Sequence, residues 1–482
     1  MSATEPVSAA ATTRADPHTR RPNRGRDSTL IVVYLSLGGL AFSVLQSLVA
    51  PALSTIGTDL GASTTDVTWI LTAYLLSASV LTPILGRLGD MVGKRRILIV
   101  VLALLLLGTV LAALAPTLSV LIAARVLQGA AGAIMPLSIG IVRDVLPPER
   151  ISVTIGLLSA IFGVGGGIGI VAAGPIVQSL NWHWLFWLPA GLIIIALSGA
   201  IVGMPESPVR RPGRLDVLGS VILSVALVSL LLAVSDGQKW GWGSALTLSL
   251  FTLGAIALVV FVRVELRVRQ PLIDVRLFTI RGVWTAHVVS LIVGFAMFGV
   301  FVLIPPLLEL PARTGYGFGT TVTEAGLLLL PIVIAMVALG PFGGMLVRTQ
   351  GAKLPMLLGG ILLAAAFALP AIAHDHLWQI VVAEALAGAG IGLALASTAN
   401  ALIDVVPATQ TGEAISANAI ARTIGSSIGT AAIAALLASH SSAHAIPTNA
   451  GFTIAFWTGT AVALVGVLAT LVAPSPRRMP SP

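Results

Sequence analysis

Apolar stretches long enough to cross a lipid bilayer as helices follow one another from Leu30 to Val472, and no other feature constrains the fold as strongly. We predict fourteen such spans, which cover residues 30–56, 67–86, 97–115, 118–143, 151–177, 184–203, 216–234, 245–264, 282–308, 322–347, 354–372, 377–402, 413–438 and 449–473. The chain is 56% hydrophobic and 10% charged, with a mean hydropathy of +1.00, which excludes a water-soluble domain. We therefore expect an all-α integral membrane protein with 14 transmembrane helices.

Lysine and arginine are distributed unequally between the connections that join these spans. Counted in alternate connections from the N-terminal tail, 23 of the 27 basic residues fall on one side and only Lys239 and Arg313 on the other. Arg125 and Arg422 lie inside spans. Because basic connections stay in the cytoplasm, we predict a multi-pass cell-membrane protein of the bacterial inner-membrane type with both termini cytoplasmic. The same placement argues against a nucleic-acid-binding role for the net charge of +8.

A motif between the second and third predicted spans recurs in the second half of the chain. Gly86 and Gly93 frame the sequence Gly-Arg-Leu-Gly-Asp-Met-Val-Gly, and Gly344 and Gly351 frame a related sequence 258 residues later. Many secondary transporters are built from such repeats, with the substrate site between them. Because the two copies lie eight spans apart rather than six, we predict that two spans were inserted between two six-helix halves.

This count predicts five segments. We expect a disordered cytoplasmic tail, an N-terminal six-helix bundle, two accessory helices with basic cytoplasmic loops, a C-terminal six-helix bundle and a second cytoplasmic tail. They cover residues 1–28, 29–203, 204–281, 282–473 and 474–482, respectively. The first tail is rich in Ala, Thr, Pro and Arg and has no apolar segment of its own, which favours disorder.

Two motifs resemble those of the major facilitator superfamily, in its fourteen-helix drug:proton antiporter branch. The stretch Gly86–Arg96 is similar to the superfamily motif G-x-L-x-D-x-x-G-(R/K)-(R/K), and Leu121–Gly132 is similar to its fourth-span motif L-x-x-x-R-x-x-Q-G. The resemblance extends over roughly Leu30 to Val472. It implies the major facilitator fold, with two six-helix bundles and two additional helices between them, and proton-driven export of drugs.

The chain departs from that branch in two places. The fifth-span antiporter motif, G-x-x-x-G-P-x-x-G-G, is only partly matched, with Ile170 in the place of the proline and Ala173 in the place of a glycine. The acid that the branch usually carries in its first span is absent, since no acid occurs between Asp27 and Asp59. These departures leave the proton carrier and the direction of transport open.

Gly86, Asp90, Gly93 and Arg95 form the predicted gating loop. Its glycines would let the turn approach neighbouring helices closely. Asp90 is an acid among basic residues and can accept backbone N–H groups or pair with an arginine. The resemblance implies that Asp90 is part of a latch between the two halves. The alternative is a solvated loop that serves only as a topological anchor.

Arg125 and Glu384 occupy corresponding positions in the two repeats, deep inside predicted spans. A guanidinium at that depth costs on the order of 2.5–3.5 kcal/mol, so Arg125 must face the bundle interior and find a partner. Burial favours the neutral form of Glu384 and a nearby arginine favours its charged form, and the sequence does not decide between them. We predict that the two lie close together and couple transport to protons, with Glu384 as the carrier. Static structural roles for both are the alternative.

Polar and aromatic residues on the faces of four spans form the predicted substrate cavity: Gln46, Trp69, Tyr74, His287, Phe295, Asn418 and Arg422. A cavity with few charges and much aromatic and aliphatic surface suits a lipophilic or amphiphilic substrate. Any one of these aromatic side chains could equally face lipid or fill a helix contact. Arg422 is equally compatible with a structural role.

These features predict a secondary active transporter that exports lipophilic or amphiphilic small molecules, such as drugs or antibiotics, in exchange for protons. A facilitator or importer of another amphiphile or lipid, without tight proton coupling, is the first alternative. A non-transporting membrane receptor or scaffold is the alternative from another class. The sequence has no cysteine, no Walker motif and no metal-ligand spacing, so we expect no enzyme activity, metal or cofactor. The expected partners are a lipophilic small-molecule substrate, protons and membrane lipid, with no nucleic acid. We expect the chain to be a monomer.

Overall fold

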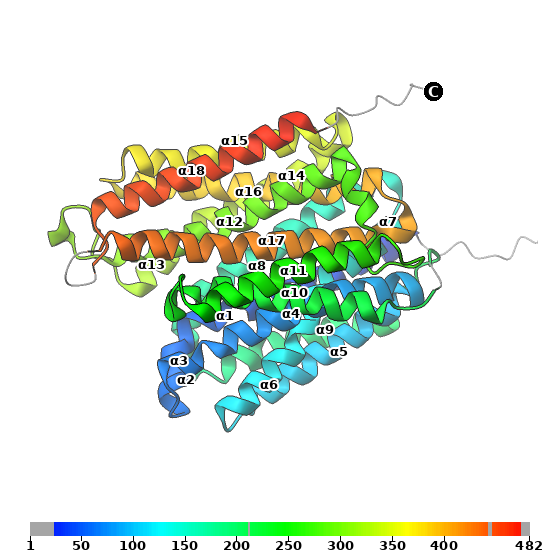
Figure 1. Ribbon diagram of the computed structural model, residues 1–482, viewed down its shortest axis with the longest axis horizontal. Coiled ribbons are helices and arrows are strands. Elements are labelled where there is room, and N and C mark those ends of the chain that lie inside the picture. Colours follow the sequence, from blue (N-terminus) through cyan, green and yellow to red (C-terminus); the bar gives the residue numbers. More distant parts are fainter. Residues whose placement is uncertain (1–23, 211–212, 442–445, 474–482) are drawn as a thin grey trace, which may run out of the picture.

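The computed structural model describes residues 24–210, 213–441 and 446–473. Within these ranges it contains 14 helical segments that are long and apolar enough to cross a membrane (Figure 1), so the predicted all-α membrane fold is confirmed. Most of the predicted N-terminal tail and all of the C-terminal one, residues 1–23 and 474–482, lie outside the described residues.

The first six spans form the N-terminal half. They are α1 (Arg24–Leu48), α4 (Trp69–Val92), α5 (Lys94–Ala113), the continuous run of α6 (Leu118–Gln128), η2 (Gly129–Ala133) and α7 (Ile134–Val145), α8 (Pro148–Ser179) and α9 (Trp184–Val202). Three short elements join α1 to α4, namely η1 (Ala50–Ala52), α2 (Leu53–Asp59) and α3 (Thr64–Val67).

The last six spans form the C-terminal half. They are α12 (Arg281–Glu309), the pair α13 (Val322–Leu328) and α14 (Leu330–Gln350), α15 (Lys353–Ile372), α16 (Leu377–Val405), α17 (Thr411–Ser439) and α18 (Asn449–Val472). Short 3₁₀ turns accompany them at η3 (Val275–Thr279), η4 (Ala312–Thr314) and η5 (Ala408–Gln410).

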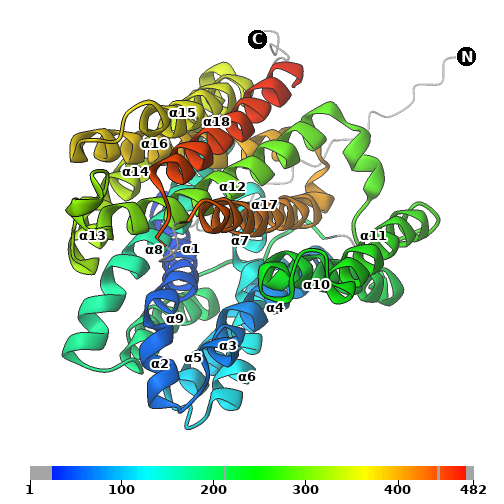
Figure 2. The same cartoon turned by 60° about the vertical axis from the view of Figure 1, so that its left-hand side comes forward.

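Two accessory helices, α10 (Val217–Trp240) and α11 (Ala245–Glu265), connect the halves in sequence. Each begins at a side-chain cap, because Asp216 accepts a hydrogen bond from the backbone of α10 and Ser244 from that of α11. Helix α10 packs against α4 and α17, one from each half, while α11 packs chiefly on α10. Figure 2 shows this pair at one side of the molecule, beside α4.

The predicted gating loop is helical over most of its length, which corrects the expected end of the second span. Helix α4 continues past Gly86 and Asp90 and ends only at Gly93, whose φ of +130° is a conformation that residues with side chains rarely adopt. Nothing before Gly93 breaks the helix, so these two residues keep helical geometry and share one face of α4 at a spacing of four.

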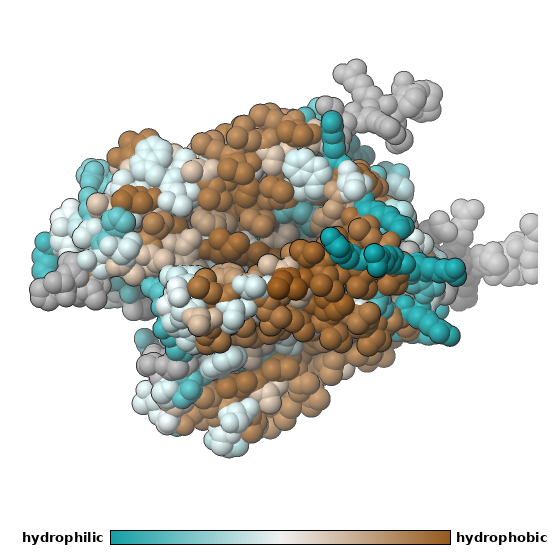
Figure 3. All heavy atoms as spheres, viewed as in Figure 1, coloured by the Kyte–Doolittle hydropathy of each residue, from teal (hydrophilic) through white to brown (hydrophobic). Residues whose placement is uncertain are grey.

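One apolar core lies mainly in the N-terminal half and takes in residues of α12, α16 and α17, and a second core lies in the C-terminal half. Apolar side chains also cover the middle of the outer surface. Figure 3 shows this brown zone between more hydrophilic ends, as a bilayer-spanning bundle requires. We refer to the two ends by a residue at each, as the Asp90 end and the Glu309 end. Successive spans run alternately between them.

Candidate functional site

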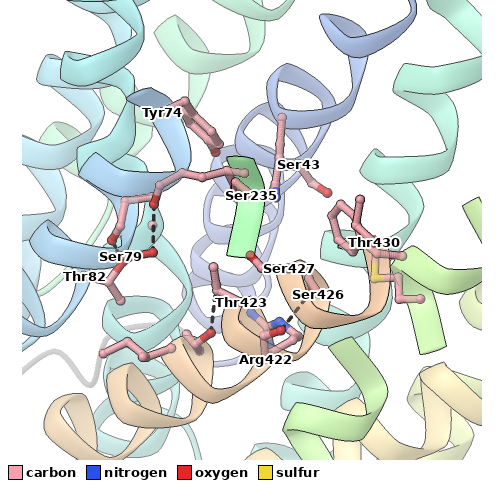
Figure 4. A pocket seen from close by; sticks show the side chains of 18 of the residues that line it. Ser43, Tyr74, Ser79, Thr82, Ser235, Arg422, Thr423, Ser426, Ser427 and Thr430 are labelled. Atoms are coloured by element: carbon pink, nitrogen blue, oxygen red, sulfur yellow. Dashed lines mark hydrogen bonds between the residues drawn. The ribbon is translucent and has the colours of Figure 1, made fainter. Parts of the chain in front are cut away.

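A cavity of about 280 Å³, the central cavity, lies between the two halves (Figure 4). Both halves contribute to its wall, and α10 does so as well. Its polar lining consists of Ser43, Gln46, Tyr74, Ser79, Thr82, Ser235, Gln238, Arg422, Thr423, Ser426, Ser427 and Thr430. Its larger apolar side chains are Phe42, Leu75, Met135, Phe162, Met297, Phe298, Leu395 and Ile420. Arg422 is the only charged residue in this lining.

A second cavity of about 660 Å³, the vestibule, extends from the central cavity toward the Glu309 end. The two share several lining residues, among them Gln46 and Phe298. The vestibule is also lined by Gln178 and Glu309, which are exposed at the molecular surface. The central cavity is therefore reached from the Glu309 end.

Hydroxyl groups in the central cavity fall into two sets. Ser79 and Ser426 donate to carbonyl oxygens one turn earlier in their own helices, at 2.8 and 3.0 Å, which satisfies their protons while leaving oxygen lone pairs. Ser427 and Thr430 have no hydrogen-bond partner among the described residues, and neither do the Gln46 and Gln238 amides. These four side chains are available to a bound molecule.

The guanidinium of Arg422 reaches from α17 toward the N-terminal half. Its Nη2 atom lies 3.5 Å from the sulfur of Met135 on α7, and the described residues offer it no other side-chain contact within hydrogen-bonding distance. None of the ion pairs in the described part of the chain involves Arg422. The arginine thus brings positive charge to the cavity wall with only a weak acceptor beside it.

Asp90 joins the two halves at the Asp90 end, opposite the end from which the central cavity is reached. Its Oδ2 atom accepts a hydrogen bond of 3.3 Å from the backbone N–H of Glu413, in the first turn of α17. A carboxylate at a helix N-terminus is favourably placed because the unpaired N–H groups there carry partial positive charge. Lys94 lies 3.4 Å from Asp90, and Arg87 lies 3.9 Å from the Glu413 carboxylate.

Arg143 makes a second connection at the same end, which the sequence reasoning missed. From α7 it donates to the Thr411 hydroxyl at 2.5 Å and to the Val406 and Pro407 carbonyl oxygens at 2.9 and 3.3 Å. Its planar fork of donors suits these three acceptors, which lie between the end of α16 and the first residue of α17. The sequence does show a basic residue at the end of the fourth span. The preference of basic residues for the cytoplasmic side already explains such a residue, so its position did not indicate a contact between the halves.

The repeated glycines mark the places where the two halves cross. A Cβ on Gly86 of α4 would lie 2.1 Å from the Ser416 hydroxyl of α17, and one on Gly344 of α14 would lie 2.2 Å from the backbone oxygen of Ser152 in α8. Each repeat therefore uses its glycine to approach the opposite half. The duplicated motif has a structural reason in this interface.

Gly93 and Arg95, in contrast, make their contacts with α9 and with the segment that follows it. A Cβ on Gly93 would meet the Glu206 carboxylate at 2.7 Å. The Arg95 guanidinium donates to the backbone oxygens of Ala200 and Ile201 in α9. Of the four predicted gating residues, the structure brings only Gly86 and Asp90 against the other half.

Arg125 is fully buried in the N-terminal half and ties three of its helices together. It donates to the backbone oxygens of Ile70 and Leu45 at 3.2 and 3.4 Å and to the side-chain oxygen of Gln128 at 2.8 Å. The guanidinium carbon also lies 4.2 Å from the centre of the Tyr74 ring. These contacts explain how a positive charge is tolerated there without an acid.

Glu384 is equally buried, in the C-terminal half, with an exposed fraction of 1%. Neither carboxylate oxygen has a hydrogen-bond partner among the described residues. Gly388 and Gly392 continue its helical stripe and pack against the α14 backbone, where their added Cβ atoms would lie 2.0 and 3.0 Å from carbonyl oxygens. The structure does not bring Glu384 and Arg125 together, because each faces the core of its own half.

The predicted cavity residues divide into two groups. Gln46, Tyr74 and Arg422 line the central cavity. The other four line neither cavity: Trp69 is partly exposed on α4, His287 packs against Phe278, Phe295 lies in the C-terminal core, and Asn418 bonds Ser290 and the Ala286 carbonyl. These four lie on the outer or core-facing sides of their helices.

Helix α10 contributes Ser235 and Gln238 to the cavity, which sequence reasoning also missed. The predicted span ended at residue 234, whereas α10 runs on to Trp240. The polar residues that follow the apolar run were the available signal. They were counted as part of a connection rather than as a helix face.

Two six-helix halves that close around a central cavity at one end and leave it reachable from the other define a membrane transport protein. The sequence model of the Major Facilitator Superfamily matches residues 35–316 and 286–482, and the chain belongs to this family. The predicted family is thereby confirmed.

Known relatives agree with this assignment. An uncharacterised transporter of the family from Mycobacterium tuberculosis is 33% identical over 446 residues, which are 90% of this chain but only 62% of the relative's length. The Tetracenomycin C resistance and export protein of Streptomyces glaucescens is 29% identical, over 86% of this chain and 77% of its own. The crystal structure of the human organic anion transporter MFSD10 has a TM-score of 0.65 at 16% identity and covers 93% of this chain and 100% of its own, a likeness of fold alone.

Proposed function

We propose that this transporter exports lipophilic or amphiphilic small molecules across the cell membrane in exchange for protons, by alternating access. The observation that carries the proposal is the central cavity, where aromatic rings and available hydroxyl and amide groups from both halves surround a space suited to an amphiphile. The relative that exports tetracenomycin C supports an antibiotic-like substrate.

The direction of export rests on the orientation of the chain. The unequal distribution of basic residues favours a cytoplasmic Asp90 end, because the basic connections gather there. In that orientation the structure corresponds to an outward-facing state, with the cytoplasmic side closed by Asp90, Arg143 and the repeated glycines. Rocking of the halves about the cavity would open the other side.

Proton exchange is assigned to Glu384. Its support is a buried carboxyl group with no hydrogen-bond partner among the described residues, at the repeat position of Arg125. Arg125 would act by holding α1, α4 and α6 in one unit rather than by pairing with Glu384. Asp90 and Gly86 would act as the latch that stabilises the outward-facing state.

Inverted membrane vesicles with an acidic interior test this function. The probe is 1-anilinonaphthalene-8-sulfonate, a permanent anion that does not follow a pH gradient by itself. We expect uptake to exceed that of vesicles without the transporter and to be lost when nigericin collapses the gradient. Uptake that ignores nigericin would indicate a facilitator, uptake only in right-side-out vesicles an importer, and binding without uptake a receptor.

A further inference from the structure

We infer that the central cavity binds substrates through an anionic group held by Arg422, so that the preferred cargo is an amphiphilic anion such as an aromatic carboxylate or sulfonate. This inference rests on the proposed function and specifies the chemical class of its substrate. Four observations carry it, namely the contacts of Arg422, those of two other arginines, the rest of the cavity lining and the acids that lie nearby.

The first observation is the incomplete satisfaction of the Arg422 guanidinium. Five N–H donors can extend from this group, and the described residues provide a single contact, with a thioether sulfur 3.5 Å away. A thioether carries no charge and accepts hydrogen bonds weakly. The remaining donors are therefore directed to the cavity that Arg422 lines.

The second observation is the contrast with the arginines that have structural roles in the same chain. Arg125 has three oxygen acceptors and an aromatic ring, and Arg143 has three oxygen acceptors. Oxygen acceptors of the protein thus meet most of the donors of these two arginines, although Nη2 of Arg125 has no hydrogen-bond partner among the described residues. Arg422 has no oxygen acceptor among the described residues, which sets it apart as an arginine that recognises a ligand.

The third observation is the chemistry around the guanidinium. Available donors from Gln46, Ser427 and Thr430 lie in the same cavity and can add neutral hydrogen bonds to an anion. The rings of Phe42 and Phe298 provide apolar surface for the body of the molecule. An arginine can hold a carboxylate or sulfonate by two parallel hydrogen bonds, which fixes its orientation.

The fourth observation concerns the acids that could compensate the charge. The lining of the central cavity contains none, and the only charged residue of the vestibule lining is Glu309, which is exposed. Asp90 and Glu413 are engaged with Lys94 and Arg87 at the closed end. A cationic amphiphile would meet uncompensated positive charge in the cavity, whereas an anion would be attracted.

The test compares two probes that share an aromatic body. These are 1-anilinonaphthalene-8-sulfonate and N-phenyl-1-naphthylamine, which lacks the sulfonate. Their binding to the full chain in nanodiscs is measured by fluorescence, with empty nanodiscs subtracted. We expect the wild type to bind the anion at least about tenfold more tightly than the neutral probe, as hydrogen bonds to a charged group imply.

Three variants locate the effect. Arg422→Gln should weaken binding of the anionic probe by about tenfold or more and leave the affinity for the neutral probe within about twofold of the wild type. Arg422→Lys should retain part of the preference, because the charge remains without the planar fork. Arg313→Gln removes an exposed cation outside both cavities and should not change the affinity for either probe.

Equal wild-type affinity for the two probes would overturn the inference, as would an equal loss of both in Arg422→Gln. If Arg422→Gln fails to fold, as judged by size-exclusion chromatography, the wild-type pair and the lysine variant still decide. The binding assay needs no gradient, so it separates the two proposals. A preference for the anion without gradient-driven uptake contradicts the proposed export alone, and gradient-driven uptake of only the neutral probe contradicts the anion site alone.

Discussion

Arg125 and Glu384 are buried at matching positions of the two repeats, but they differ in their hydrogen-bond partners. Two donor nitrogens of Arg125, Nε and Nη1, are met by two backbone carbonyls and one amide oxygen, whereas neither carboxylate oxygen of Glu384 has a partner in the described part of the chain. A buried polar group with hydrogen-bond partners stabilises the fold. A buried charged group without partners lowers the stability of the fold, whereas its neutral form costs less. This difference supports the proposed structural role of Arg125 and the proposed coupling role of Glu384.

Replacing Arg125 by lysine should destabilise the protein although the charge is kept. An ammonium group cannot reach both carbonyls and Gln128 in the geometry of the guanidinium, so we expect a loss of about 1–3 kcal/mol in the free energy of unfolding, measured by denaturant titration in micelles. Tyr74→Phe is the matched control, since it keeps the ring and removes a hydroxyl with no described partner. It should change stability by less than about 0.5 kcal/mol. Wild-type stability of Arg125→Lys would contradict this role.

Glu384→Gln keeps the side-chain shape and removes its ability to exchange a proton. In proteoliposomes with an imposed pH gradient, we expect uphill accumulation of the anionic probe to be lost while exchange of external for internal probe continues within about twofold. Glu309→Gln serves as the control, because this acid is exposed at the end of the vestibule. If Glu384→Gln still accumulates probe at the wild-type rate, the proton carrier is another residue.

At the scale of elements, the interface between the halves depends on helices that cross with almost no space between their backbones. Helix α14 meets α8 at Gly344, and α4 meets α17 at Gly86. A methyl group at either crossing would force a backbone or a neighbouring side chain to move. Separation of the halves at the Asp90 end would break this packing, so a change at either crossing is expected to bias the conformational equilibrium.

Gly344→Ala should therefore shift the protein toward a state that is open at the Asp90 end. Its matched control is Gly343→Ala, whose added methyl meets Leu393 and Ala396 of the same half at 3.2 Å or more. Spin labels at Glu149→Cys and Thr349→Cys, on exposed positions of α8 and α14, report the separation of the halves by double electron–electron resonance. The distance distribution should move to longer values in Gly344→Ala alone. Identical distributions in the two variants would contradict the gating role of the glycine.

Helix α10 is predicted to shape the cavity rather than only to connect the halves. Gln238→Leu removes an available amide from the lining, and we expect transport of the anionic probe to fall by about three- to tenfold, with protein yield unchanged. Ser249→Ala on the exposed face of α11 should have no effect. Unchanged transport in Gln238→Leu would show that α10 lies beside the substrate path without taking part in it.

The fold was predictable from the sequence because long apolar runs and a repeated glycine motif are local patterns. The cavity was only partly predictable, since Gln46, Tyr74 and Arg422 line it while Phe295 and Asn418 face helix contacts. Which side of a helix meets the cavity depends on how the halves pack, and a span that is apolar all round does not reveal this. The contacts of Arg143 and the place of Gln238 in the cavity wall depend on how distant segments pack, so no local pattern predicted them.

At the scale of the whole molecule, the two halves pack together along α8 and α14, and polar contacts of Asp90 and Arg143 join them at the Asp90 end. The cavity between them is reached from the opposite end. The proposed exchange of substrate for protons requires that the two halves rock and that the proton-loaded and substrate-loaded states favour different arrangements. We therefore propose that substrate and protons move across the membrane in opposite directions and that neither crosses without the other.

That coupling is tested most directly by letting a substrate gradient move protons. Proteoliposomes contain a dextran-linked pH indicator, start with equal pH on both sides and have their membrane potential clamped by valinomycin and potassium. When 1-anilinonaphthalene-8-sulfonate is added outside, inward movement of the probe should drive protons out, so we predict that the interior becomes alkaline in the wild type and stays unchanged in Glu384→Gln. Probe entry without any pH change, or with acidification of the interior, would contradict proton exchange.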